Sequence, residues 1–377
     1  MIKIPFLAPR PARLSTLMDE LEEIEATGVF TNYGPVNTRF EQALVKELFG
    51  RGGCLTVNNA TLGLMLAMRD AVGNAPASGQ RFALMPSFTF AATAHAAIWA
   101  GLTPLLCDID AQTWLARADA EEELLKRYGG QVSVVVPYAT FGNCIDLKRY
   151  DRLARDYGVS VVVDAAASLG SVDEAGRCFG VGSRWPIVYS MHATKTFATG
   201  EGGIIYCDDA ELLRRLRAMG NFGFGEPRTA TMPGLNAKLS EIGALLGLAK
   251  LRELEGIVTH RAELAEAYRK NLPGWTFQQI VGQRLAYQFI PVLLPDRLHS
   301  QRDAIIAELA KNGIAVAKYF SPHLAEQPYF EKTSRIGDLT TTKHVSQRIL
   351  SLPLFDGMSA AEVEQVCETL RKVTGEA

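Results

Sequence analysis

The sequence predicts an α/β fold, with a mostly parallel central sheet flanked by helices and a smaller α+β domain after it. Between Cys54 and Cys207, short and continuously apolar segments alternate with helical ones, a pattern typical of strands buried on both faces. After Cys207 this alternation stops, and a chain of 377 residues leaves room for a second, smaller unit. We therefore expect a large domain with an N-terminal helical arm over residues 1–235, and a linking helix with a small C-terminal domain over residues 236–377.

The large domain is expected to begin with two helices. Residues 13–27 have an amphipathic pattern, with Thr16 and Asp19 in capping-box spacing and Gly28 as the end. Thr31–Pro35 is a turn before the second helix, Val36–Phe49. The predicted strands that follow are Cys54–Val57, Phe82–Met85, Pro104–Cys107, Val132–Val136, Val159–Val163, Ile187–Tyr189 and Ile204–Cys207. The helices between and after them are Leu62–Val72, Phe90–Ala100, Ala118–Tyr128, Leu147–Tyr157 and Ala210–Met219.

The remaining chain has a different pattern. Asn221–Pro233 contains Gly and Pro and reads as a loop, and one long helix is expected from about Ser240 to Asn271. The small domain is then predicted to contain strands at Ala286–Leu294 and Ala315–Phe320. Helices are expected at Arg302–Asn312 and Ala360–Val373.

Composition excludes several classes of protein. The net charge is −2, so no basic surface for nucleic acid is implied. No apolar run reaches transmembrane length and the N-terminus lacks a signal-peptide core, so we expect a cytoplasmic protein without a membrane partner. The six cysteines have no metal-ligand spacing, which predicts reduced core residues and no metal site.

The stretch around Lys195 carries the strongest chemical signal. It lies among small residues between two apolar strands, with Gly200, Gly202 and Gly203 after it. Desolvation lowers the pKa of an amine, and a neutral amine attacks carbonyl groups, which is the chemistry of a Schiff-base lysine. A lysine taken at random is more often a solvated loop residue. Ser190 shifts this balance, because its hydroxyl is placed to hold a phosphate.

A second signal is Asp164, at the end of the strand Val159–Val163. A carboxylate at a buried strand end is costly unless it is paired, and the protonated ring nitrogen of pyridoxal phosphate (PLP) is a suitable partner. The alternative is an aspartate that caps the next turn. With Lys195 following in the chain, we favour the cofactor role.

Two strand-to-helix junctions complete the candidate site. Asn58-Asn-Ala-Thr-Leu-Gly63 opens a helix, whose N-terminus suits a phosphate, although an ordinary helix cap is the simpler interpretation. Pro86-Ser-Phe-Thr-Phe-Ala-Ala-Thr93 offers Phe88 and Phe90 as aromatic rings able to lie on a pyridine ring, or as core residues.

These motifs resemble one known family. Ser190-Met-His-Ala-Thr-Lys195 followed by Gly200-Glu-Gly-Gly203 resembles the cofactor-lysine segment of the DegT-type nucleotide-sugar aminotransferases, which are PLP enzymes of fold type I. The resemblance runs from Thr31-Asn-Tyr-Gly-Pro35 to Leu350-Ser-Leu-Pro-Leu354. It implies that Lys195 binds PLP and that the reaction transfers an amino group from glutamate to a nucleotide-linked keto sugar.

The resemblance also assigns roles to single residues. It places the phosphate contacts on Thr61 and on the Leu62 N–H, and the ring-stacking aromatic on Phe90. Asn236, in Gly234-Leu-Asn236, is expected to reach the phosphate of a neighbouring subunit, which implies a homodimer with shared active sites. Possible substrate contacts are Tyr33, Tyr138, His192 and His323.

The sequence departs from the family pattern at several positions. Asn59 stands in place of a serine, Gly63 in place of an alanine, and Ala139 where a histidine is frequent. Ala167 replaces a glutamine or histidine that contacts the phenolic oxygen of PLP, and Ser168 is the neighbour that offers a substitute hydroxyl.

Two other functions on the same fold remain open from the sequence. Sugar dehydratases resemble this family but carry histidine in place of the lysine, so Lys195 argues against dehydration. A non-enzymatic regulatory protein is the second alternative, and an intact pair of Lys195 and Asp164 argues against it.

Overall fold

The central sheet is mostly parallel, as predicted. The computed structural model describes residues 2–73 and 81–375. Its strands hydrogen-bond in the orders β11-β3-β2-β4-β5 and β1-β8-β7-β6, and every ladder is parallel except those of β8 with β1 and β7. The strands are β1 (Gly53–Val57), β2 (Phe82–Pro86), β3 (Thr103–Cys107), β4 (Val132–Val135), β5 (Ser160–Val161), β6 (Val163–Asp164), β7 (Ile187–Ser190), β8 (Gly203–Cys207) and β11 (Arg335–Ile336).

The two groups of strands form one continuous surface. β5 and β6 follow each other along a single extended stretch, interrupted only at Val162. The Val162 N–H donates to the Val135 carbonyl at 3.0 Å, and the Val163 N–H donates to the Pro186 carbonyl at 2.9 Å. This stretch therefore connects β4 on one side with β7 on the other.

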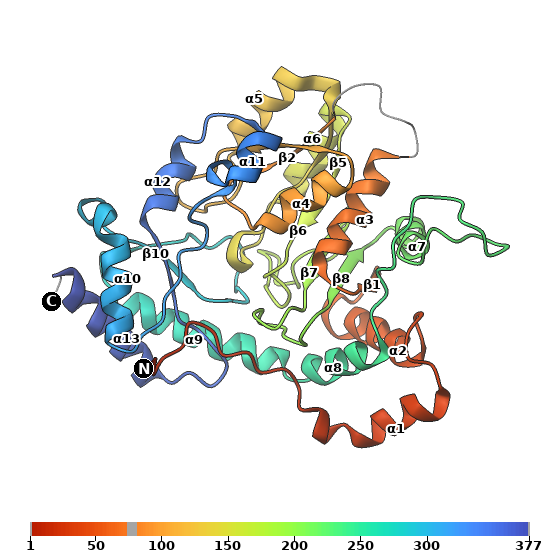
Figure 1. Ribbon diagram of the computed structural model, residues 1–377, viewed down its shortest axis with the longest axis horizontal. Helices are drawn as coiled ribbons and strands as arrows, with labels where there is room; N and C mark the ends of the chain where they lie inside the picture. The colour runs from red at the N-terminus through yellow and green to blue at the C-terminus, as the bar shows by residue number, and fades with distance from the viewer. Residues whose placement is uncertain (1, 74–80, 376–377) are drawn as a thin grey trace.

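Helices cover both faces of the sheet (Figure 1). One face packs against α3 (Ala60–Val72), α4 (Ala91–Trp99) and α7 (Ala210–Met219). The opposite face packs against α2 (Pro35–Leu44), α5 (Ala118–Tyr128), α6 (Leu147–Tyr157) and α8 (Glu241–Leu251). Alternate strand residues feed the two cores: in β2, Leu84 joins one and Met85 the other. Strands buried on both faces explain why their sequences are continuously apolar.

A smaller antiparallel sheet follows in the C-terminal part of the chain. It contains β9 (Thr276–Phe277), β10 (Ile290–Leu293) and β12 (Ile349–Leu352), with β10 in the middle. Its core is shared with α9 (Leu254–Asn271), α10 (Arg302–Lys311) and α13 (Ala360–Thr374). Both chain ends lie at this side of the molecule (Figure 1).

Several contacts run across residue 235. Val258 of α9 packs into the core of the large sheet, whereas Leu264 of the same helix packs into the small one. Ile4 bridges to Ile314, and β11 pairs with β3 of the large sheet. The division into residues 1–235 and 236–377 therefore stays a prediction.

Three helix predictions need correction. Residues 13–27 contain a 3₁₀ turn, Leu14–Thr16, followed by α1 (Met18–Thr27). The capping box is absent, because the Thr16 hydroxyl donates to the Arg13 carbonyl at 2.8 Å. The second helix widens into a π-helical turn, Val45–Phe49, after Leu44. The single helix expected over 240–271 is two helices, α8 and α9, separated at Arg252 and Glu253.

The strand predictions for the small domain were less accurate. Ala286–Leu294 is a strand only at β10, and Ala315–Phe320 is not a strand. Ala317 makes one bridge to Ser351, after which the chain turns, with the Ser321 N–H bonded to the Lys318 carbonyl at 2.7 Å. A proline at 322 also removes a ladder donor. The sequence analysis missed β9, α11 (Pro328–Thr333), β11, α12 (Thr340–Arg348) and β12.

Across residues 2–73 and 81–375, no helix combines the length and the apolar character needed to cross a bilayer. The six cysteines are free thiols, and all except Cys178 are buried.

Candidate active site

A cavity of about 580 Å³ opens beyond the carboxyl ends of β4, β6 and β7. This is where ligands bind in open α/β sheets. The structure brings most of the predicted residues together in its wall. Those lining it are Thr61, Leu62, Phe90, Tyr138, Asp164, Ser190, His192 and Lys195.

The Lys195 side chain projects from the loop between β7 and β8. Its backbone is held in a turn by a bond from its N–H to the His192 carbonyl at 2.8 Å. Its Nζ donates to Oε1 of Gln288 at 2.9 Å. Burial lowers the pKa of this amine to about 8, although the negative charge of Asp164 opposes the shift. The neutral fraction of this amine near physiological pH is therefore much larger than that of an exposed lysine.

Asp164 ends β6, lines the same cavity and is buried, with 3% of its surface exposed. Its Oδ2 accepts from the Thr93 hydroxyl at 2.6 Å, and its Oδ1 accepts from the Ala166 N–H at 3.1 Å. Burial raises the pKa of this carboxyl, while these two donors and the charge of Lys195 lower it. The carboxylate is thus buried with free acceptor capacity toward a cationic ligand.

The expected phosphate contacts surround the start of α3. Ser190 ends β7, and its hydroxyl accepts from the His192 N–H at 3.2 Å. Asn59 is the N-cap of α3, and its Oδ1 accepts from the Leu62 N–H at 2.9 Å. The predicted phosphate contact of the Leu62 N–H is therefore not available in this conformation, because the cap already uses that donor. Thr61 lies in the first turn of the helix and faces the cavity.

The structure distinguishes the two aromatic residues that were candidates for stacking on the cofactor ring. Phe88 is completely buried, whereas Phe90 precedes α4, lines the cavity and has 55% of its surface exposed. An exposed phenyl ring beside a buried carboxylate offers a flat apolar face to a ring that Asp164 contacts.

These observations fit PLP. Asp164 is a suitable partner for the protonated ring nitrogen of PLP, and Phe90 offers a flat surface for its ring. Lys195 is the amine that would bond to its carbonyl carbon. Ser190 and the N-terminus of α3 would hold its phosphate. The groups come from five different parts of the chain, yet they line one cavity.

His192 and Tyr138 also lie in the cavity wall, as expected. The His192 Nδ1 is 2.8 Å from the Thr194 hydroxyl, and its Nε2 is 3.7 Å from a Glu201 carboxylate oxygen. Tyr138 is buried beside Asp164, and burial together with that negative charge raises the pKa of its phenol.

Three predicted residues are absent from the described cavity lining. The Tyr33 ring is instead covered by the Arg217 guanidinium, whose central carbon is 4.5 Å from the centroid of that ring. Asn236 is exposed, and its Oδ1 accepts from Lys238 Nζ at 2.6 Å. His323 is fully buried, with Nδ1 2.9 Å from the Ser87 hydroxyl and Nε2 3.4 Å from Glu326. A substrate contact from His323 is therefore not supported by its position, since its polar neighbours are protein groups.

The sequence analysis missed two residues that contact the central pair. Thr93 donates to Asp164, and Gln288 accepts from Lys195. Thr93 closes the Pro86–Thr93 motif, so its position carried a signal, whereas Gln288 lies in the second half of the chain without a recognisable motif. Ser168 does not replace the missing side chain at Ala167, because its hydroxyl donates to the Asn143 carbonyl at 3.1 Å, inside the core.

Comparison with known proteins gives a consistent assignment. A profile of the DegT/DnrJ/EryC1/StrS aminotransferase family matches residues 13–371. A Bacillus cereus protein assigned as a PLP-dependent aminotransferase is 39% identical; the match covers 97% of this chain and 99% of that protein, with a TM-score of 0.91. DesI, solved in the presence of its TDP-sugar product, is 30% identical, with a TM-score of 0.87 and coverage of 99% and 94%.

A dTDP-4-amino-4,6-dideoxy-D-glucose transaminase from Escherichia coli is 28% identical over 97% of this chain and 98% of its own length. The family match spans nearly the whole chain and includes the cavity with Lys195 and Asp164. This chain therefore belongs to the DegT/DnrJ/EryC1/StrS aminotransferase family and is a PLP-dependent aminotransferase.

Proposed function

We propose that this enzyme transfers an amino group from glutamate to a keto-deoxysugar carried on a nucleotide, in amino-sugar biosynthesis. Two relatives support the substrate class. The E. coli relative is named for a dTDP-linked amino sugar, and DesI was solved with a TDP-sugar product. The family match also favours amino transfer over the dehydratase and regulatory alternatives.

The observation that carries the proposal is the additional space next to the Phe90 side of the cavity. A second hollow of about 280 Å³ shares Phe90, Tyr319 and Phe320 with the main cavity. Lys318, Ser321 and Gln327 line its other side. A pocket for PLP and a small amino acid alone does not need this extension, whereas a sugar with a nucleotide attached does. Aromatic rings beside polar groups suit a sugar ring and a base.

Each residue of the site has a proposed role. PLP, when bound, supplies a carbonyl carbon that condenses with amines and a ring that accepts electrons. Asp164 keeps the ring nitrogen protonated, Phe90 covers one ring face, and Ser190 and Thr61 bind the phosphate. Tyr138 and His192 line the part of the cavity that the substrate enters.

Lys195 performs the proton transfers. Its neutral Nζ takes the proton from the α-carbon of glutamate in the first half-reaction, which ends with 2-oxoglutarate. In the second half-reaction the same nitrogen delivers a proton to the sugar carbon that carried the keto oxygen. An amine whose pKa is about 8 suits both directions, because it is readily protonated and deprotonated near neutral pH.

A two-part assay tests the proposal. With glutamate alone, the PLP-loaded enzyme should release one 2-oxoglutarate per active site and then stop. Adding a nucleotide-linked keto sugar should restart turnover and yield a sugar product with one additional amino group. A Lys195→Ala variant with bound PLP is the matched control and should do neither at a comparable rate.

Other outcomes would contradict the proposal in distinguishable ways. A deoxygenated sugar without a new amino group would indicate a dehydratase. Turnover with ordinary keto acids, with a panel of nucleotide-linked keto sugars inert, would place the enzyme in amino-acid metabolism. We also infer a cytoplasmic location, which the buried free thiols support, since reduced cysteines are typical of that compartment.

A further inference from the structure

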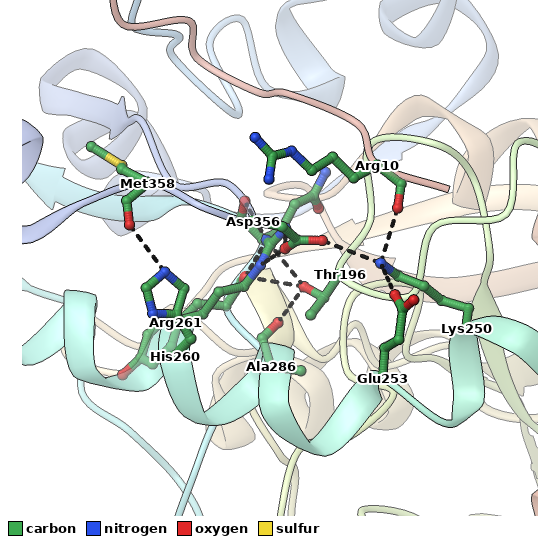
Figure 2. A network of polar contacts seen from close by, with 11 residues as sticks. Arg10, Thr196, Lys250, Glu253, His260, Arg261, Ala286, Asp356 and Met358 are labelled. Atoms are coloured by element: carbon green, nitrogen blue, oxygen red, sulfur yellow. Dashed lines mark hydrogen bonds and ion pairs between the residues drawn. The ribbon is translucent and has the colours of Figure 1, made fainter. Parts of the chain in front are cut away.

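A network of largely buried charged side chains centres on Asp356 (Figure 2). It joins α8, α9, the segment after β12 and the N-terminal arm through Lys250, Arg261, Asp356 and Arg10. Lys250 is only 1% exposed and Arg261 only 4%. Burying two cations is costly, so their partners need to be closely matched.

Asp356 lies between the two cations. Its Oδ1 accepts from Nε of Arg261 at 2.9 Å and from Nη2 at 2.6 Å, while its Oδ2 accepts from Lys250 Nζ at 3.2 Å. Lys250 also donates to the Arg10 carbonyl at 3.0 Å and to Glu253 at 3.4 Å. These contacts fix the plane of the Arg261 guanidinium, since two of its three nitrogens bond to a carboxylate that is itself held.

The third guanidinium nitrogen points toward the active site. Nη1 of Arg261 donates to the Tyr287 carbonyl at 2.8 Å and is 3.4 Å from both the Thr196 hydroxyl and the Gln288 carbonyl. The Thr196 hydroxyl is itself 3.0 Å from the Tyr287 carbonyl and 3.2 Å from that of Ala286. Thr196 follows Lys195 in the chain, and Gln288 is the residue that accepts from the Lys195 amine.

We propose that Arg261 is a positioning residue for Lys195. Held by Asp356, it locks the segment 286–288 against Thr196, so that Gln288 and Lys195 meet at a fixed place in the cavity. Arg261 does not contact the amine. It acts on the backbone on both sides of the Lys195–Gln288 contact, and small displacements of a reacting group are known to be costly.

Lys250 provides a matched control. It is as deeply buried as Arg261 and bonds to the same carboxylate, yet its own described partners are Arg10, Glu253 and Asp356, none of which lines the cavity. Replacing either cation with methionine removes one positive charge from Asp356. Only the Arg261 replacement also releases the segment 286–288.

The test uses the cofactor-free, full-length protein and measures the Lys195 amine directly. Limiting acetic anhydride is applied across a pH series, and mass spectrometry of the Lys195 peptide gives the midpoint of its reactivity. The wild-type midpoint should lie near the pKa of about 8 that burial imposes. The ionisable groups that line the cavity with the amine are Asp164, His192 and Glu201, and those in the network around Arg261 are Asp356, Lys250, Glu253 and His260. All except the replaced residue stay in each variant.

In Arg261→Met the freed segment should admit water to the amine, so the midpoint should rise by about one unit toward that of an exposed lysine. The rate of the glutamate half-reaction should fall about tenfold or more with little change in KM. Arg261→Lys should recover part of both effects, and Lys250→Met should raise the midpoint much less than Arg261→Met does, because it leaves the bond from Arg261 to the Tyr287 carbonyl in place. The inference rests on Lys195 as the reactive amine of the proposed function. Because the labelling needs neither PLP nor sugar, a negative labelling result would contradict the role of Arg261 without contradicting the proposed amino transfer.

A midpoint in Arg261→Met that stays at the wild-type value or falls would overturn the proposal, and so would an equal rise in Lys250→Met. Circular dichroism and thermal melts show whether each variant is folded. If Arg261→Met does not fold, Thr196→Val tests the same set of contacts, because the Thr196 hydroxyl also donates to the Tyr287 carbonyl. A folded Thr196→Val enzyme with an unchanged midpoint would then count against the inference.

Discussion

At the scale of single residues, Asp164 is a buried carboxylate whose charge is expected to keep the ring nitrogen of PLP protonated. Removing its charge while keeping its shape is a direct test of its role. Asp164→Asn should bind PLP but lose about 3 kcal/mol or more of transition-state stabilisation, roughly a hundredfold in kcat/KM, as when one partner of a buried charged pair is lost. The measurement is the glutamate half-reaction of the PLP-loaded variant.

Thr93 is the corresponding control, because its hydroxyl donates to the same carboxylate at 2.6 Å without carrying charge. Thr93→Val should cost less than Asp164→Asn, on the order of one hydrogen bond to a charged group, about 1.5–3 kcal/mol. Near-normal turnover in PLP-loaded Asp164→Asn would show that the carboxylate does not sustain the cofactor.

The same aspartate influences the pH dependence of Lys195. Its negative charge favours the protonated amine and so keeps the pKa of Lys195 higher than burial alone would set it. In Asp164→Asn, the midpoint for acetylation of Lys195 in the cofactor-free protein should therefore move below about 8, opposite to the shift expected for Arg261→Met. An unchanged or raised midpoint would mean that the two groups do not interact.

Sequence reasoning found Asp164 because it stands at the end of a continuously apolar strand, and Lys195 because it lies among small residues between two such strands. Both patterns are local. Sequence reasoning could not find Gln288, because the Lys195–Gln288 contact joins residues 93 positions apart. Nothing in the sequence of either segment indicates that the two lie together. The contact of the Leu62 N–H with a phosphate, which the family resemblance implies, stays a prediction. In the folded helix start the Asn59 side chain accepts from the same N–H, a competition that the sequence does not reveal.

At the scale of elements, the close approach of β8 to α3 shapes the phosphate end of the cavity. A Cβ added at Gly203 would lie 2.7 Å from the Ala60 nitrogen and 2.8 Å from the Asn59 carbonyl carbon. Gly203→Ala should therefore lower the free energy of unfolding by about 1–3 kcal/mol and weaken PLP binding, because α3 must shift. Thermal melts and PLP titration measure the two effects.

Gly256 is the control for that substitution. It is exposed in α9, and an added Cβ would meet nothing within 4 Å. Gly256→Ala should raise stability by about 0.5–1 kcal/mol through helix propensity and leave PLP affinity unchanged. If Gly203→Ala melted at or above the wild-type temperature, the tight packing would not constrain the cavity.

The predictability of elements differed between the two parts of the chain. Strands of the large sheet are buried on both faces, so their apolar runs stood out. α12 and β12 were missed because Thr340–Arg348 is polar and leads into a short apolar strand without a turn signal between them. Ala315–Phe320 has strand-like composition, but its ladder ends after one bridge because the chain bends at Lys318–Ser321.

At the scale of the whole molecule, we propose a homodimer with shared sites. The loop between α7 and α8 extends away from the body of the chain (Figure 1). Asn236 lies in the last part of this loop, is exposed and is absent from the described lining of its own cavity. An exposed residue of this kind is available to a neighbouring subunit. Such a dimer would place Asn236 of one subunit near the phosphate bound by the other.

Mixing two inactive variants tests this arrangement. A Lys195→Ala subunit paired with an Asn236→Ala subunit has one site with both defects and one with neither. An equal mixture that exchanges subunits freely should therefore regain about a quarter of the wild-type activity, as expected for random pairing in a two-fold dimer. Each variant alone at the same concentration is the control. No recovery after proven subunit exchange, or an active monomer, would refute shared sites.

The pairing of β11 with β3 has a consequence for how the chain is made. β3 ends at residue 107, but the strand that covers its outer edge, Arg335–Ile336, is more than two hundred residues away in the sequence. A chain still emerging from the ribosome therefore holds β3 with unpaired backbone groups until most of the protein has been synthesised. Unpaired strand edges are templates for aggregation during folding. Chains truncated before residue 335 should accordingly be recovered in inclusion bodies more often than the full-length protein, even though Lys195 and Asp164 are already present in them.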